Sequence, residues 1–292
     1  MANLKEIRNR ISSVSSTMQI TSAMKMVSAS KLKRAQDAMT QMKPYAEKLK
    51  EILANLSASL DTSENIYSQE RDVKNVLIVV ITSNRGLCGG FNNYVVKKAL
   101  KLANEDYKGM NVSVLPVGKK ATDSFKKTEF MGKHDFLPSS ADDVWGDLNF
   151  SNSNDIAEKI MTAYKEEKLD KVVVVYNTFV NVATQVPTAT QFLPIVQAET
   201  AETSVSADYI FEPSKKEIVT ELIPKSLKTQ FYAHLLESHA GEHGARMTAM
   251  HKATDNATEL NKELKLQYNK ARQAAITNEI LEIVGGAEAL NG

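Results

Sequence analysis

The sequence predicts an α/β fold with long helices: an antiparallel coiled coil of the N- and C-terminal helices plus a central Rossmann-like α/β domain. Three observations lead to this prediction. Residues 1–60 carry an apolar stripe at helical spacing, and residues 213–288 have the composition of a second long helix. Between them, residues 72–210 alternate apolar β-branched runs with helical patterns, which is typical of a parallel sheet covered by helices.

The N-terminal helix is predicted by a heptad pattern. Its apolar residues alternate between spacings of three and four, which is the seam of a coiled coil: Leu4, Ile7, Ile11, Val14 and Met18. The stripe continues beyond Pro44, so we expect a bend at this proline and not the end of the helix. Residues 1–50 are strongly basic, but no aromatic residue before Tyr45 offers a base a stacking surface. A solvated face, or a face presented to an acidic protein partner, is therefore favoured over nucleic acid.

The central segment is predicted to form a mostly parallel sheet. Three continuous apolar runs are typical of strands buried on both faces: 75–82, 111–117 and 171–176. Helical patterns fall at 91–107, 119–127 and 155–167. The order of strand, helix and strand favours right-handed parallel crossovers. Residues 181–186 and 188–195, separated by Pro187, predict two further strands at an edge of the sheet.

The C-terminal helix is predicted by composition. After Pro224 the chain has no further proline, and it is rich in Ala, Leu, Lys, Glu and Met, which favours one helix from Lys225 to Val284. A helix of this length must pack along another long helix or run inside a partner. Gly241 and Gly244 each cost such a helix about 1 kcal/mol relative to alanine. They mark either a close approach of another element or a bend, and the sequence leaves both open.

A glycine-rich turn follows the first predicted strand. Its residues are Arg85, Gly86, Leu87, Cys88, Gly89 and Gly90. Strand, glycines and helix is the arrangement that holds a pyrophosphate in dinucleotide-binding proteins. This turn matches neither G-x-G-x-x-G nor G-x-x-x-x-G-K-[ST], so it places no phosphate-binding lysine. We therefore predict a tight turn that needs a positive φ at a glycine, and no cofactor.

The chain offers no catalytic constellation. Cys88 has no identifiable histidine partner, and a small buried thiol is the favoured interpretation. His239 and His243 are four residues apart and thus able to share a metal ion, but no cysteine or carboxylate pattern completes the site. We expect a solvated helix face there, and no metal. The single cysteine excludes an internal disulfide, and no apolar run approaches the about 18 residues of a membrane span.

Several motifs together resemble the gamma subunit of F-type ATP synthases of the bacterial type. They extend in order over the whole chain: residues 20–27, 44–47, 85–90, 185–187, 245–250 and 269–273. The resemblance implies a central rotor shaft that transmits rotation between a proton- or sodium-driven membrane c-ring and a catalytic hexamer of alpha and beta subunits. It implies no enzyme activity in this chain, one copy per complex, and a peripheral location on the cytoplasmic face of the bacterial inner membrane.

The resemblance also implies partner-binding residues. Arg272 and Gln273 would hold an acidic loop of a beta subunit. Met24 and Lys25 would face the hexamer from the N-terminal helix. A hydrophobic collar of the hexamer would receive Ile276, Ile280, Ile283 and Val284, and the foot on the c-ring and epsilon subunit would include Tyr45, Tyr209 and Glu212.

Two other classes of protein stay open at this point. One is a coiled-coil adaptor with a nucleotide-binding α/β domain, which predicts symmetric self-association through residues 1–60. The other is an α/β enzyme with a helical dimerisation arm, which predicts that the isolated chain binds a nucleotide.

Overall fold

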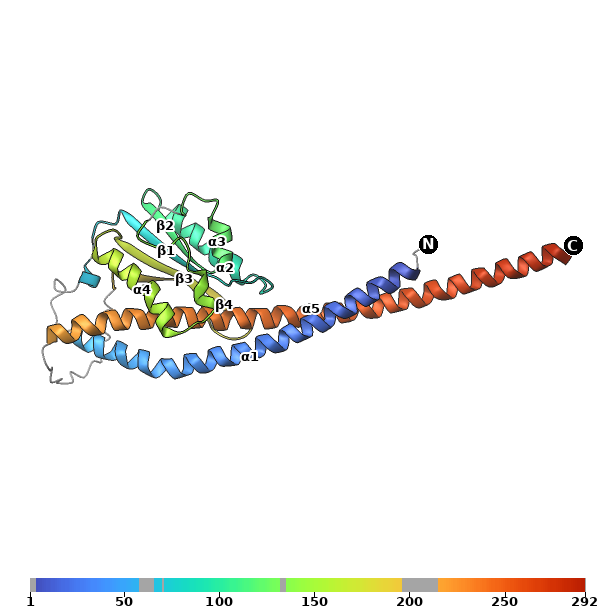
Figure 1. Ribbon diagram of the computed structural model, residues 1–292, viewed down its shortest axis with the longest axis horizontal. Helices are drawn as coiled ribbons and strands as arrows, with labels where there is room; N and C mark the ends of the chain where they lie inside the picture. The colour runs from blue at the N-terminus through green and yellow to red at the C-terminus, as the bar shows by residue number, and fades with distance from the viewer. Residues whose placement is uncertain (1–3, 58–65, 70, 132–134, 196–214, 292) are drawn as a thin grey trace. The chain divides into compact units, whose positions relative to one another are not determined.

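Along the sequence, two long helices precede and follow a small mixed sheet in the computed structural model (Figure 1). It describes residues 4–57, 66–69, 71–131, 135–195 and 215–291. The first helix, α1, spans Leu4–Ser57, and the last, α5, spans Lys215–Asn291. These residues fall into two compact units: Met1–Ser28 with Met247–Gly292, and Ala29–Arg246. No described helix is both long enough and apolar enough to cross a membrane.

The sheet has the strand order β2-β1-β3-β4. Its strands are β1 (Asn75–Ile81), β2 (Asn111–Val117), β3 (Lys171–Phe179) and β4 (Gln185–Leu193). β1 pairs in parallel with both β2 and β3, and β4 pairs antiparallel to β3. The predicted parallel sheet with added edge structure is confirmed. β1 lies between β2 and β3. The chain therefore passes from β1 to β2 on one side and then returns to place β3 on the other side of β1.

The prediction of two edge strands is wrong, because a single strand, β4, runs through Pro187. An edge strand tolerates a proline since one of its sides makes no ladder hydrogen bonds. Residues 181–184 form the hairpin turn and not a strand. The Asn181 side chain accepts hydrogen bonds from the backbone N–H groups of Ala183 and Thr184 at 2.9 and 2.8 Å, which favours a turn over an extended chain.

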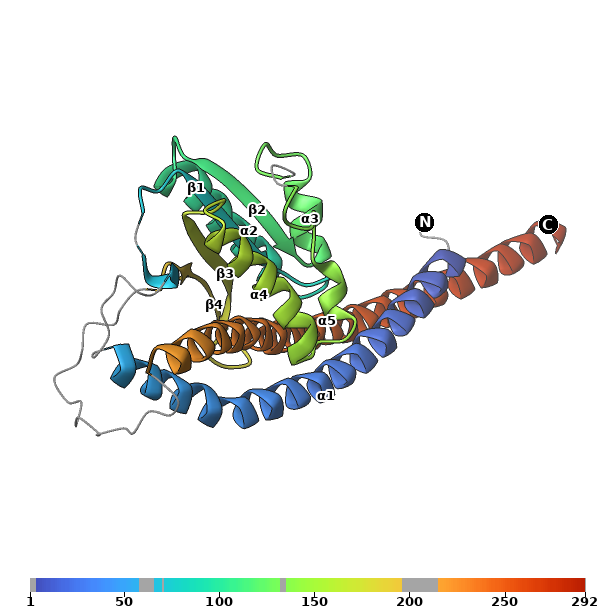
Figure 2. The ribbon, with the colours of Figure 1, turned by 60° about the vertical axis from the view of Figure 1, so that its left-hand side comes forward.

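Two apolar layers cover the faces of the sheet (Figure 2). On one face, alternate β1 residues such as Val76 and Val80 pack with α2 (Phe91–Lys101) and α3 (Lys119–Phe125). On the other face, Leu77 and Ile81 pack with α4 (Phe150–Lys165) and with residues 223–235 of α5. Residues 223–235 of α5 therefore belong to the core of the domain, a role that a coiled-coil pattern alone does not predict.

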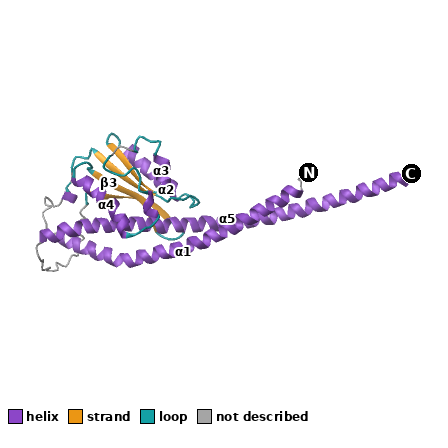
Figure 3. Cartoon of the chain, viewed as in Figure 1, coloured by secondary structure: helices purple, strands orange, loops and turns teal. Residues whose placement is uncertain are grey.

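The shorter helices match the predicted ones, with one shifted boundary (Figure 3). A five-residue π-helix, Leu102–Asp106, extends α2. α4 begins at Phe150 and not at 155, because Asn149 caps it by accepting a hydrogen bond from the Asn152 backbone N–H at 2.8 Å. Residues 149–154 are mostly Asn and Ser and precede the predicted helix at 155–167. Asparagine favours both loops and N-caps, so composition alone did not separate the two.

The termini pair antiparallel, as predicted. Within the unit of residues 1–28 and 247–292, the Thr254 hydroxyl donates to that of Thr21 at 2.8 Å. The Thr258 hydroxyl lies 3.3 Å from the Met18 sulfur. Still further along α5, Tyr268 accepts a hydrogen bond from Arg8 at 2.8 Å. Partner numbers rise on α5 as they fall on α1, which defines antiparallel helices. α1 also continues through Pro44 without ending.

Candidate functional site

The last part of α5 is exposed on all sides. Every side chain from Arg272 to Glu288 is exposed, and α5 continues past the first described turn of α1 (Figure 1). Tyr268 accepts a hydrogen bond from Arg8 near the start of α1, and residues 269–291 beyond it extend over about 35 Å of helix. The predicted collar residues Ile276, Ile280, Ile283 and Val284 are 48, 54, 67 and 49% exposed. Apolar surface at this density marks an interaction site.

Arg272 and Gln273 lie at the start of this single helix. Both side chains are exposed, and their neighbours Ala271, Ala274 and Ala275 are small. The guanidinium is a planar group of five donors able to hold a carboxylate by two parallel hydrogen bonds. The glutamine amide adds a donor and an acceptor. The pair is thus available to a partner.

The outward side of α1 carries a second apolar surface. Met24 is half-buried, and its carbonyl accepts a hydrogen bond from the Ser28 hydroxyl at 2.7 Å. The Lys25 ammonium lies 3.4 Å from His251 Nδ1. The motif of residues 20–27 also contains three exposed apolar residues that sequence reasoning did not assign to a partner: Ile20, Met26 and Val27. They lie off the heptad seam that runs through Met18 and Thr21, and this offset is the signal that would have identified them.

The predicted foot is only partly described. Tyr45 lies on α1 in the unit of residues 29–246 and is 51% exposed. An exposed aromatic ring of this size suits an interface. Tyr209 and Glu212 lie outside the described residues.

The glycine-rich turn is a tight loop held by hydrogen bonds within the chain. Gly89 has φ +60°, which confirms the predicted positive φ, and Leu87 adopts φ +65° as well. Asn92 fastens the turn by accepting from the Ser83 backbone N–H at 2.9 Å and donating to the Cys88 sulfur at 3.2 Å. Burial raises the pKa of the Cys88 thiol, which favours the unreactive protonated form. The prediction of a small buried thiol is confirmed.

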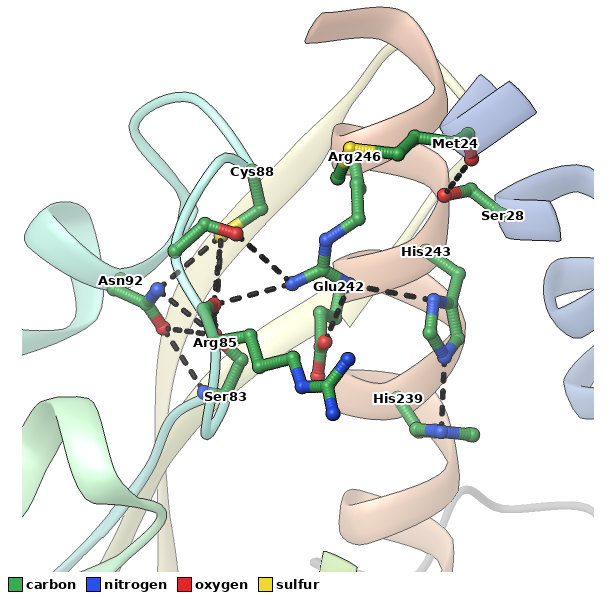
Figure 4. A network of polar contacts seen from close by, with 11 residues as sticks. Met24, Ser28, Ser83, Arg85, Cys88, Asn92, His239, Glu242, His243 and Arg246 are labelled. Atoms are coloured by element: carbon green, nitrogen blue, oxygen red, sulfur yellow. Dashed lines mark hydrogen bonds and ion pairs between the residues drawn. The ribbon is translucent and has the colours of Figure 1, made fainter. Parts of the chain in front are cut away.

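Arg246 joins this loop to α5 (Figure 4). Its guanidinium donates to the carbonyls of Arg85 and Gly86 at 3.1 and 3.2 Å, and it pairs with the Glu242 carboxylate at 2.5 Å. Arg246 and Glu242 are 7% and 8% exposed. Burial raises the pKa of Glu242, and Arg246 opposes this rise. A buried charge needs such partners, so the loop and the helix are tied by one charged group.

Close approach explains the two glycines of α5. A β-carbon on Gly241 would lie 3.2 Å from the Phe91 ring and 3.3 Å from Gln185 Cγ. One on Gly244 would lie 3.3 Å from the Val182 carbonyl oxygen. These distances are tighter than ordinary contacts of a β-carbon. Of the two interpretations left open by the sequence, the structure therefore supports the close approach of another element.

Three of the four histidines of α5 are partly or fully buried, so the prediction of a solvated helix face at His239 and His243 is wrong. His234 packs on Tyr176 with 4.4 Å between the ring centroids, and His239 stacks on Trp145 with 5.6 Å between the ring centroids. Burial lowers the pKa of His234 and His239 to about 4 and that of His243 to about 3. His251 is exposed, as predicted. Within the described ranges, no group of three or more metal-ligating side chains is found.

These features define a class of protein: an α/β domain with paired terminal helices, one of which ends in an exposed, partly apolar rod. The family model described as ATP synthase matches residues 3–290. The chain belongs to the gamma chain family of ATP synthases. It is 59% identical to the ATP synthase gamma chain of Christiangramia forsetii and 58% identical to that of Flavobacterium johnsoniae, each over 100% of both chains.

Solved structures show the same fold. A chain of the Euglena gracilis mitochondrial ATP synthase rotor, in rotational state 1, matches with a TM-score of 0.63 and 20% identity. The match covers 94% of this chain and 98% of that one. A chain of the Tetrahymena thermophila mitochondrial ATP synthase central stalk and c-ring matches with a TM-score of 0.58 and 23% identity, over 80% and 99%.

Proposed function

We propose that this chain is the central rotor shaft of a proton- or sodium-translocating ATP synthase. It transmits rotation between the membrane c-ring and the catalytic alpha/beta hexamer. The observation that carries this function is the single helix of residues 269–291, which continues past a hydrogen-bonded antiparallel pair and exposes apolar side chains. A shaft needs a stiff paired part to carry torque and a projecting end for a partner to enclose.

The hexamer contacts lie on the projecting end and on the outward side of α1. The collar receives Ile276, Ile280, Ile283 and Val284, which explains why a helix end so rich in apolar groups is left uncovered by the described residues. Met24 and Lys25 contact the hexamer from α1.

Arg272 and Gln273 hold an acidic loop of one beta subunit. A charge-assisted hydrogen bond of this kind contributes about 1.5–3 kcal/mol when partly desolvated. Because a rotating shaft meets each beta subunit in turn, a contact formed at only some angles favours one conformation of one subunit over the others. The energy of this contact thereby makes the conformation of one beta subunit, and so of its catalytic site, differ from that of the others.

The foot and the location complete the proposal. Tyr45, together with Tyr209 and Glu212, contacts the c-ring and the epsilon subunit. The active sites are on the beta subunits, the complex holds one copy of this chain, and it sits peripherally on the cytoplasmic face of the bacterial inner membrane. The proposed organisation remains a helix at 1–60, a domain at 72–210 and a helix at 213–288.

Purification from the native membrane tests the function. The chain, tagged at its N-terminus, is expected to bring down alpha, beta, epsilon and c subunits, with one copy of itself for three of each hexamer subunit. A tagged chain that recovers only untagged copies of itself contradicts the shaft and favours the adaptor.

ATP hydrolysis by the purified complex tests the contact with the beta subunit. Arg272→Ala with Gln273→Ala is expected to lower turnover steeply while the complex still assembles, because assembly draws on the larger helix and foot surfaces. Arg272→Lys should give an intermediate rate, since it keeps the charge and loses the fork. Lys262→Ala, which removes another exposed charge of α5, is the matched control. Normal turnover in the double variant would remove this assignment.

A further inference from the structure

A chain of hydrogen bonds runs along one side of α5 within the unit of residues 29–246 (Figure 4). It begins at the carbonyls of Arg85 and Gly86, which accept from Arg246 Nη2. Arg246 Nη1 lies 3.4 Å from His243 Nδ1, and His243 Nε2 lies 3.1 Å from His239 Nε2. One guanidinium therefore contacts both the loop and His243, and His239 is linked to it through His243.

The donors along this chain assign the tautomers of both rings. A guanidinium has only donors, so His243 Nδ1 must be the acceptor and carries no proton. The proton of His243 is then on Nε2, which donates to His239 Nε2. His239 in turn must carry its proton on Nδ1. The arrangement holds only while both imidazoles are neutral, because a second proton on either ring sets two N–H groups against each other.

The surroundings add a second reason for neutrality. Two cations act on both rings, Lys31 from α1 and Arg246 from α5. The neighbouring carboxylate, Glu242, pairs with Arg246 and also lies near Lys31 and Arg85. The short helix at Asp142–Trp145 contributes the Trp145 ring, which stacks on His239 at an angle of 22°. Asp142 on the same short helix accepts instead from Thr122 and from the Gly118 backbone N–H.

We propose that His239 and His243 form an acid-sensitive latch, which holds the loop of residues 83–90 against α5 while both rings are neutral and releases it when they are protonated. A proton gained by His243 repels Arg246 directly, and the loop then loses the donor shared by two of its carbonyls. The state favoured by acid is therefore one in which residues 239–246 and the loop separate.

Two single residues of the chain serve as native probes of this separation. Cys88 is the only cysteine and is buried in the loop, and Trp145 is the only tryptophan and touches His239. The rate at which a dithiodipyridine, which reacts with thiols in acid as well as at neutral pH, labels Cys88 is measured in the full chain at pH 7.5 and 5.5. The same rate in guanidinium-unfolded chain at each pH gives the protection factor.

The protection factor of Cys88 is expected to fall about 10-fold for each latch histidine, or about 100-fold for both, between pH 7.5 and 5.5. This figure takes an ordinary pKa of about 6.5 in the released state and rings that stay neutral in the latched state. In His239→Gln with His243→Gln the factor should be the same at both pH values, and in His243→Gln alone it should fall about 10-fold. Trp145 fluorescence of the wild-type chain should decrease with acid, since a charged imidazolium quenches the indole that it stacks on.

His251→Gln is the matched control, because His251 is an exposed histidine of the same helix and its replacement should keep the wild-type pH dependence. Low guanidinium concentrations distinguish local release from unfolding, since labelling through local release does not speed up with denaturant. The latch is refuted by equal wild-type protection at the two pH values. It is refuted equally by a double variant that loses as much protection as wild type, or by labelling that depends on denaturant as global unfolding does.

Discussion

Glu242 is the residue whose loss should most weaken the attachment of α5 to the α/β domain. Glu242→Ala removes the carboxylate that pairs with Arg246, a residue only 7% exposed in the structure. Removing one partner of a buried ion pair costs about 3–5 kcal/mol, because an uncompensated charge is left behind. The carbonyls of Arg85 and Gly86 still accept from Arg246. We therefore expect Glu242→Ala to lower the free energy of unfolding by about 3 kcal/mol, near the lower end of this range.

The assay is equilibrium unfolding in urea at pH 7.5, followed by the fluorescence of Trp145, which lies in the same unit of residues 29–246. Glu242→Gln is the matched variant. It keeps the size of the side chain and one acceptor oxygen, so roughly half of the loss is expected. The double variant Glu242→Ala with Arg246→Met should lose less than the sum of the two single variants, because neither charge is then stranded.

The stability cost of Arg246→Met should depend on pH, and the direction of this dependence is an independent test of the Glu242–Arg246 pair. Burial raises the pKa of Glu242, and this variant removes the guanidinium that opposes the rise. A carboxyl group with a raised pKa in the folded state takes up a proton more readily there than when unfolded. The cost of Arg246→Met relative to wild type should therefore shrink as the pH falls from 8 to 5. A loss below about 1 kcal/mol for Glu242→Ala, or strictly additive variants, would refute the reasoning.

Three further predictions concern the rest of the chain. Met18→Cys with Thr258→Cys, made in a chain without Cys88, should crosslink within one chain, because the native side chains lie 3.3 Å apart; crosslinks found only between chains would contradict the antiparallel pair. The pKa of His234 is lowered to about 4 by burial, so the unfolded state gains its proton below about pH 6.5 and the folded state does not. Stability is then present above pH 6.5 and lost as the pH falls, by about 2 kcal/mol at pH 5 for this residue, and urea unfolding of His234→Gln should show a correspondingly smaller decline. Tyr45→Ala should release the soluble sector from the membrane in a low-salt wash more readily than wild type, and unchanged retention would count against the foot contact.

The long helices and the parallel strands could be predicted because each rests on local periodicity. The heptad at Ile7, Ile11 and Met18 and the apolar run of β1 specify helix and buried strand whatever surrounds them. The continuity of β4 through Pro187 and the start of α4 at Phe150 depend instead on residue types that suit more than one structure. Pro187 and Asn149 are each compatible with a loop, and only the edge position of β4 and the capping bond of Asn149 decide otherwise.

The burial of the histidine face could not be predicted, because it depends on where α5 docks. His234, Ser238 and Gly241 recur at spacings of four and three, which describes one side of a helix, and His239 and His243 share another side. Neither spacing says what covers the helix. The two glycines carried the usable signal, since small residues on one side of a helix allow another backbone to approach closely. Weighing them together with the histidines would have predicted a tightly packed face rather than a solvated one.

The docking of α5 also explains why a nucleotide-like loop need not bind a nucleotide. In an open α/β sheet, ligands bind beyond the carboxyl ends of the strands, where the crossovers diverge. Here that place lies between β1 and β3, and the residues around it are the 83–90 loop and the hairpin at Val182. Gly244 brings α5 close to the hairpin at Val182, and Gly241 brings it close to Phe91, the first residue after the loop.

The polarity of the loop is reversed as well. A phosphate-binding turn directs backbone N–H groups at its anion, whereas this loop directs two carbonyl oxygens at the Arg246 guanidinium. The loop thus binds a cation of the chain itself, on a helix that continues to residues 269–291. This arrangement disfavours a nucleotide-binding adaptor or enzyme. It favours a domain that uses a ligand-binding architecture to anchor a helix.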